Sequence, residues 1–281
     1  MLNTNYTIDS LTVKADDETR MRSFYRDVLK LIEKQENNNS YSYAYTQKDK
    51  PFLTLIFNGR KNVSPHKGLY HFALLFPDSA SLASLIERLI LINYPLGSGD
   101  HDVSEAFYLN DPNGNGIELY HDRPKALWEW HDNLVKMGTK EVDLLTLLKT
   151  KKAAWAGFPD EMKVGHIHFV GDNITKGDTF FIDELKMALT ATIADSAHFY
   201  SHNHYHHHHA YNTWLGTNLT QREYYDNGLV SWTISVDSDY FTVLQSNNRN
   251  TSNQPGQIWL TDPFGSTLII HEKNYSEKSA Q

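Results

Sequence analysis

Apolar and polar positions follow a pattern that recurs four times along the chain. Each repeat opens with a short apolar or alternating run that ends near an acidic residue, which is typical of a strand leading into a helix cap. These opening runs lie at residues 6–17, 68–78, 164–173 and 228–237. The first three are followed by amphipathic stretches that predict helices at 18–34, 79–93 and 174–189. The fourth predicts a short helix at best.

Strand-like stretches follow each predicted helix. The second and fourth repeats close with an Asp-Pro-x-Gly sequence, at 111–114 and 262–265, in which Pro and Gly suit a tight turn before a final strand. The pattern predicts an α+β fold of four β-α-β-β-β units, grouped as two domains at 5–122 and 163–273, with the last unit shortened. Residues 123–160 lack this pattern and are predicted to form a helical linker.

Composition limits the classes of function. The 281 residues include 26 Lys and Arg against 34 Asp and Glu, a net charge of −8 that argues against a nucleic-acid partner. No apolar run approaches the roughly 20 residues that a membrane-spanning helix requires. The opening residues also lack the basic and apolar regions of a secretory signal. Because cysteine is absent, thiolate metal ligands and a cysteine nucleophile are excluded. We expect a soluble, cytoplasmic protein.

Several motifs resemble those of one protein family. They are GLYHFALLFPD (68–78), HDVSEAFYLNDPNGNGIELYHDRP (101–124), GHIH (165–168) and YHHHHAYNTW (205–214). They are similar to motifs of two-domain catechol 2,3-dioxygenase-like proteins in the vicinal oxygen chelate superfamily, which includes glyoxalase I, fosfomycin resistance enzymes and type I extradiol dioxygenases. The resemblance implies that the units close in pairs into half-barrel pockets, each able to surround one divalent metal ion.

The resemblance also implies where metal ligands would lie. Extradiol dioxygenases use two His and one Glu, the facial triad that suits non-haem Fe(II). At the opening-strand position the four units have Ser10, His71, His166 and Ser231, and at the closing-strand position units two and four have Glu118 and Ile269. Only a pocket that pairs unit two with unit three contains a complete triad, made of His71, Glu118 and His166. We therefore predict an inner active pocket and a metal-free outer pair of units one and four.

Further candidates surround this triad. A shorter spacing around the GHIH motif makes His168 the alternative ligand, because residues i and i+2 share a strand face. The resemblance implies an acid–base role for His207, a substrate or oxygen contact for Tyr108, and a place in the pocket for His101. In the His-rich stretch 198–209, His198, His202 and His204 are expected in loops or at a strand edge.

The resulting hypothesis is an Fe(II)-dependent extradiol dioxygenase that cleaves the ring of a catechol-like aromatic diol with O2. Mn, Zn and Ni are the alternative metals. A glyoxalase-like lyase or isomerase with a non-redox metal, or a ligand-binding resistance module without catalysis, are the alternative functions, because this scaffold supports many chemistries. The expected partners are a small aromatic substrate and O2, with no nucleic acid and no membrane, and a homo-oligomer is left open.

Overall fold

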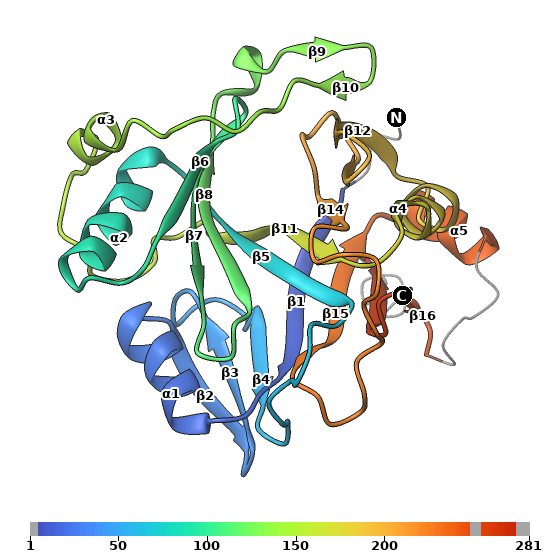
Figure 1. The fold of residues 1–281 in the computed structure, drawn as a ribbon, viewed down its shortest axis with the longest axis horizontal. Helices are drawn as coiled ribbons and strands as arrows, with labels where there is room; N and C mark the ends of the chain where they lie inside the picture. The colour runs from blue at the N-terminus through green and yellow to red at the C-terminus, as the bar shows by residue number, and fades with distance from the viewer. Residues whose placement is uncertain (1–4, 248–253, 274–281) are drawn as a thin grey trace, which may run out of the picture.

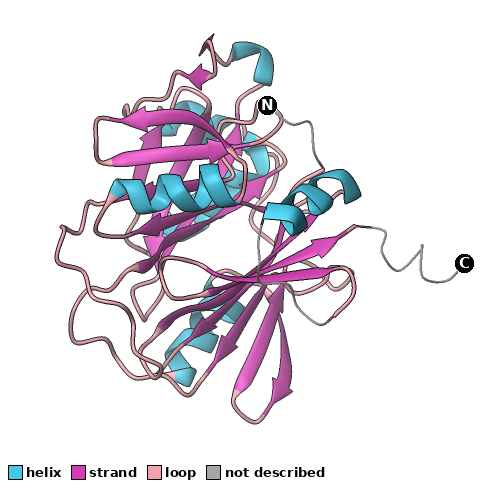
Figure 2. Ribbon diagram, turned by 90° about the vertical axis from the view of Figure 1, so that its right-hand side faces the viewer, coloured by secondary structure: helices cyan, strands magenta, loops and turns pink. Residues whose placement is uncertain are grey.

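The computed structural model describes residues 5–247 and 254–273, and strands make up most of it (Figures 1 and 2). The first unit contains β1 (Thr7–Lys14), α1 (Glu18–Arg22), the π-helical turn η1 (Ser23–Val28), β2 (Ile32–Asn37), β3 (Ser40–Ala44) and β4 (Leu53–Ile56). The second contains β5 (Gly68–Phe76), α2 (Ser79–Leu91), β6 (Gly97–Asp100), β7 (Ser104–Asn110) and β8 (Gly116–Asp122). Both units thus have the predicted order of a strand, a helix and three strands.

The third and fourth units repeat this order. The third contains β11 (Lys163–Val170), α4 (Ile174–Asp178), the π-helical turn η3 (Thr179–Glu184), β12 (Ala188–Ile193), β13 (Ala197–Ser201) and β14 (His209–Asn212). The fourth contains β15 (Gly228–Val236), α5 (Ser238–Asn247), β16 (Gln257–Thr261) and β17 (Thr267–Glu272). Within the described ranges the fourth unit therefore has one strand fewer than the others.

Two helices end earlier than the sequence pattern predicts. The helix predicted over 18–34 ends with η1, and the helix predicted over 174–189 ends with η3. Shortly after each end a lysine, Lys30 or Lys186, adopts a left-handed backbone conformation with φ of 68° or 55°. A left-handed residue ends a helix and redirects the chain, so the remaining apolar residues enter the next strand.

The prediction of a helical linker over 123–160 is wrong for most of that segment. It contains the short 3-10 turn η2 (Lys125–Leu127), the hairpin β9 (Trp130–His131) with β10 (Leu134–Val135), and the helix α3 (Leu144–Lys149). Its apolar side chains pack separately on existing surfaces, with Trp128 and Val135 beside Phe199 and with Leu147 in the main core. Because these apolar side chains pack in different places and not along one face, the segment forms turns and not one continuous helix. None of the described helices is long and apolar enough to span a membrane.

Strand pairing joins the units in a nested order. β5 of unit two pairs antiparallel with β11 of unit three, and β1 of unit one pairs antiparallel with β15 of unit four. These neighbours lie side by side in the middle of the molecule (Figure 1). The structure therefore has the expected inner pair, units two and three, and outer pair, units one and four. The domain bounds 5–122 and 163–273 stay a prediction.

The repeated Asp-Pro-x-Gly turns are fixed by their aspartates. Asp111 accepts hydrogen bonds from two backbone N–H groups of its turn and, at 2.8 Å, from the hydroxyl of Tyr25. Asp262 accepts two equivalent backbone bonds and, at 2.9 Å, one from the indole of Trp232. Each buried carboxylate thereby anchors the start of a closing strand, β8 or β17, to another part of the core.

Candidate active site

The register of three adjacent strands brings three predicted site residues together. His71 lies in β5, Glu118 in β8 and His166 in β11, with β5 between the other two strands. Ala73 of β5 is opposite both Glu118 and His166. Because side chains alternate between the two faces of a strand, the three functional groups point to the same face of the inner pair.

Two glycines allow these strands to approach closely. A register shift separates Val164 from His166, and a side chain at the intervening Gly165 would meet the hydroxyl of Tyr120 at 1.8 Å. A side chain at Gly116 would meet the backbone oxygen of Tyr70 at 2.4 Å. Each glycine is therefore required where a neighbouring group occupies the place of a Cβ atom.

The three donor atoms form a nearly equilateral triangle. Oε2 of Glu118 lies 3.0 Å from Nε2 of His71 and 3.1 Å from Nε2 of His166, and the two nitrogens are 3.3 Å apart. Donors about 2.1 Å from a metal ion would be about 3.0 Å apart in octahedral geometry and about 3.4 Å apart in tetrahedral geometry. The triangle thus matches one face of a coordination polyhedron, so this buried His-Glu-His group could hold a metal ion.

Burial and mutual contact set the charge of the group. The exposed fractions of His71, Glu118 and His166 are 6%, 3% and 1%. Burial lowers the pKa of His71 in spite of the adjacent carboxylate. Burial alone would raise the pKa of Glu118, but the contacts with His166 and His71 outweigh it and hold that pKa well below its usual range. An ionised carboxylate beside an imidazole with a free lone pair is a donor set for a divalent ion.

A cavity of about 650 Å³ opens onto this group. Its floor contains the three donors, and other parts are apolar or aromatic, including Phe199, Trp214 and Leu215. Glu118 is the only Asp, Glu, Lys or Arg among the described residues that line it. The cavity is therefore suited to a small, largely uncharged molecule with polar atoms at one end.

His207 lies beside the triad, as the sequence predicts for an acid–base residue. It lines the cavity, and its ring centroid is 4.1 Å from that of His166. Burial, together with the neighbouring histidines His166 and His206, lowers the pKa of His207 well below its usual value. Its neutral ring makes a hydrogen bond of 2.7 Å between its Nδ1 and Nδ1 of His206.

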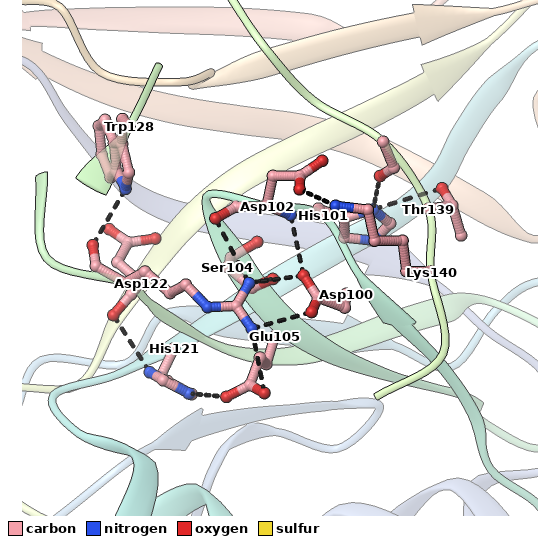
Figure 3. A network of polar contacts seen from close by, with 12 residues as sticks. Asp100, His101, Asp102, Ser104, Glu105, His121, Asp122, Trp128, Thr139 and Lys140 are labelled. Atoms are coloured by element: carbon pink, nitrogen blue, oxygen red, sulfur yellow. Dashed lines mark hydrogen bonds and ion pairs between the residues drawn. The ribbon is translucent and has the colours of Figure 1, made fainter. Parts of the chain in front are cut away.

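Tyr108 and His101 form a pair on the opposite wall of the cavity. Nε2 of His101 is 2.6 Å from the hydroxyl of Tyr108, and Nδ1 of His101 is 2.8 Å from the backbone oxygen of Gly138. That oxygen only accepts, so Nδ1 of His101 is protonated and, in the neutral ring, Nε2 accepts from Tyr108. Burial, with the nearby Glu118 carboxylate, raises the pKa of Tyr108 well above its usual value. Figure 3 shows His101 beside Thr139, whose hydroxyl is 3.5 Å from its Nδ1.

The alternative ligand His168 lies outside the triad. It is opposite His71 in the β5–β11 register and lines the same cavity, but its Nε2 is 2.9 Å from the side-chain amide of Asn212. Burial, together with the positive charges that neighbouring histidines would carry, lowers its pKa well below the usual value.

The remaining histidines of this stretch are placed partly as expected. His202 and His204 lie in the loop after β13, although His202 is fully buried and contacts Tyr240. The placement of His198 is wrong, because it lies within β13, which pairs with a strand on each side. Sequence reasoning also missed Asp122 and His206, which connect to His207. The run of consecutive histidines could have drawn attention to His206, but no sequence pattern indicated Asp122.

Comparison with known proteins finds one matching family. Residues 7–119 match the model described as the Glyoxalase/Bleomycin resistance protein/Dioxygenase superfamily. Among curated members, "Catechol-2,3-dioxygenase" of Bacillus subtilis (strain 168) is 38% identical over 180 residues. The match spans 63% of this chain and 60% of that relative.

Solved structures of superfamily members agree with the fold. A presumed dioxygenase from Bacillus subtilis subsp. subtilis str. 168 superposes with a TM-score of 0.60 at 13% identity, covering 95% of this chain and 84% of that one. Glyoxalase I from Zea mays gives a TM-score of 0.54 at 12% identity, covering 98% and 95%. At such identities the likeness shows the fold alone, and it does not distinguish between the activities named for these two proteins.

Proposed function

We propose that this protein is an Fe(II)-dependent extradiol dioxygenase that cleaves an aromatic diol with O2, and that His71, Glu118 and His166 hold the metal. The observation that carries the proposal is the triangle of two imidazole nitrogens and one carboxylate oxygen with edges of 3.0–3.3 Å. Two His and one carboxylate on a single face are the donor set of non-haem Fe(II) oxygenases. The relative named Catechol-2,3-dioxygenase supports this choice over a glyoxalase-like reaction.

The three protein donors occupy one face and leave the cavity side of the centre open. Iron bound there would supply chelation of the two diol oxygens and electron transfer from the diol to O2. With one carboxylate and two neutral imidazoles, a divalent ion would keep a net positive charge. That charge would stabilise a bound diol that has lost a proton.

His207 and Tyr108 would handle protons and orientation in this proposal. The neutral His207 ring lines the cavity and can accept the proton of a diol hydroxyl, a contribution of typically about 10²–10⁴-fold in rate. When His101 carries its proton on Nδ1 only, the hydroxyl of Tyr108 donates to its Nε2, and the tyrosine oxygen can accept a hydrogen bond from the substrate. His101 would hold Tyr108 in this orientation.

The lining of the cavity favours an uncharged substrate. A carboxylated diol would bury its negative charge where the described lining offers no Lys or Arg. Burying an unpaired carboxylate is costly, whereas Phe199, Trp214 and Leu215 provide an apolar surface for a ring substituent. We therefore propose catechol and alkyl- or aryl-substituted catechols as the substrate class.

The test is metal analysis of protein purified without air, followed by O2 uptake with a panel of diols. We expect about one iron per chain and rapid O2 uptake with catechol and 3-methylcatechol. Turnover of 3,4-dihydroxybenzoate should be at least about tenfold slower, because its carboxylate must be desolvated. Iron-loaded protein that never consumes O2 with any diol would overturn the proposal and favour the non-redox, glyoxalase-like alternative.

A further inference from the structure

A hydrogen-bond chain connects the half-buried Asp122 to the cavity through two adjacent, buried histidines. Asp122 is the last residue of β8, and its Oδ1 lies 2.9 Å from Nε2 of His206. Nδ1 of His206 lies 2.7 Å from Nδ1 of His207, which lines the cavity. The chain thus links the closing strand of unit two to the loop before β14 in unit three.

We propose that Asp122 and His206 are positioning residues that fix the orientation and tautomer of His207, so that its Nε2 presents a lone pair to the cavity. The inference rests on the proposed function, because it explains how His207 is prepared to accept a proton.

The direction of each hydrogen bond follows from the groups involved. A carboxylate only accepts, so Nε2 of His206 must carry the proton that faces Asp122. When the His206 ring carries only that one proton, its Nδ1 is an acceptor and Nδ1 of His207 donates to it. With its single proton on Nδ1, a neutral His207 has a lone pair on Nε2. That is the tautomer a proton acceptor requires.

Packing holds the intermediate histidine in place. His206 is fully buried, and its ring centroid lies 4.1 Å from that of Tyr205 and 5.1 Å from that of Trp128. The hydroxyl of Tyr205 donates to the same Oδ1 of Asp122 at 3.3 Å. The hydroxyl of Thr190 donates to the backbone oxygen of His206 at 2.6 Å. The orientation of the chain is therefore built into the fold before any substrate enters.

A second carboxylate–histidine pair provides a matched control. Oε2 of Glu105 in β7 lies 2.8 Å from Nε2 of His121, the neighbour of Asp122 in β8. Figure 3 shows these two side chains pointing toward each other beside Asp122. Neither Glu105 nor His121 lines the cavity. Glu105→Ala removes this contact and the ion pair of Glu105 with Arg123, but it leaves in place the side-chain bonds that join Asp122, His206 and His207.

The first readout is the tautomer itself, from ¹⁵N NMR of the histidine rings in zinc-loaded protein, since zinc is diamagnetic. Comparison with His207→Gln assigns the His207 signals. In the wild type we expect protonated Nδ1 and unprotonated Nε2 for His207. In Asp122→Ala the His207 signals should shift toward a mixture of tautomers, and in Glu105→Ala they should not move.

The second readout is steady-state kinetics of the iron-loaded enzyme with catechol. Asp122→Ala should lower kcat by about 10–100-fold, the range found for partners that orient functional histidines, with KM and metal content unchanged. Asp122→Asn keeps an oxygen acceptor and should recover part of the loss. Glu105→Ala should match the wild type.

Two results would overturn the inference: a wild-type His207 with its proton on Nε2, or wild-type kcat in Asp122→Ala. A wild-type protein without turnover would count against the proposed function alone. The tautomer measurement does not depend on catalysis and would still decide the role of Asp122 and His206.

Discussion

The inner and outer pairs share one strand arrangement but carry different side chains. In the inner pair His71 is opposite His168, and Ala73 is opposite both His166 and Glu118. In the outer pair the corresponding register places Ser10 opposite Thr233, and Thr12 opposite both Ser231 and Thr54. The positions of the two histidines and the glutamate are thus occupied by Ser10, Ser231 and Thr54.

This difference separates what the scaffold provides from what the side chains provide. A cavity of about 520 Å³ also lies against the outer pair, and Ser10 and Thr233 are in its lining. Space and strand geometry are therefore present in both pairs, but neutral hydroxyls do not offer a charged donor set for a divalent ion. Three side chains on equivalent strand positions decide which pair can hold a metal.

The largest expected effect comes from Glu118→Gln in the inner pair. The amide keeps the shape of the side chain but loses the charge that attracts the metal, so metal affinity should fall by more than about 100-fold, beyond the 10–100-fold that removal of an outer partner costs. Metal analysis after dialysis measures this. Thr54→Ala is the matched change in the outer pair and should leave metal content unaltered. Full metal binding by Glu118→Gln would show that the two pairs do not differ in this way.

The next effect, from His207→Ala, concerns the rate and leaves the metal in place. The three donors are untouched, so iron should stay bound and a diol should bind without air at near-normal affinity. O2 consumption should fall by about 10²–10⁴-fold, the usual contribution of a proton-transferring side chain. The exposed His204 provides the control variant His204→Ala. Loss of iron from His207→Ala would instead make His207 a ligand and enlarge the triad.

The smallest effect concerns the boundary between the pairs. His202, which follows β13 of the inner pair, packs against Tyr6 and Tyr240 of the outer pair, and burial lowers its pKa to about 4. The unfolded chain binds a proton here near pH 6.5 while the folded chain does not, so stability is lost as pH falls from about 6.5 to about 4. Between pH 7 and pH 5 this costs about 2 kcal/mol.

Urea unfolding at the two pH values measures this cost. His202→Phe should reduce the difference in unfolding free energy between pH 7 and pH 5 by about that amount. An unchanged difference would show that His202 does not make the boundary acid-sensitive.

Local pattern predicted most of the fold. The resemblance to the family supplied the candidate ligand positions, and only units two and three had His71, Glu118 and His166 at them, which indicated the crossed pairing. The His-rich stretch could not be predicted in the same way. Strand alternation would place His206 and His207 on opposite faces, but β14 begins only at His209. The preceding loop is ordered by Asp122, which lies far away in sequence.

The nested pairing has a consequence for synthesis of the chain. The strand that covers one edge of β1 (Thr7–Lys14) is β15 (Gly228–Val236), which is made about 200 residues later. At translation rates of about 5–20 residues per second, roughly 10–40 s separate the two. During that interval the inner pair can assemble, while β1 has an open edge able to pair with other chains. A newly made chain is therefore exposed to aggregation until the outer pair, which lacks the triad, is complete.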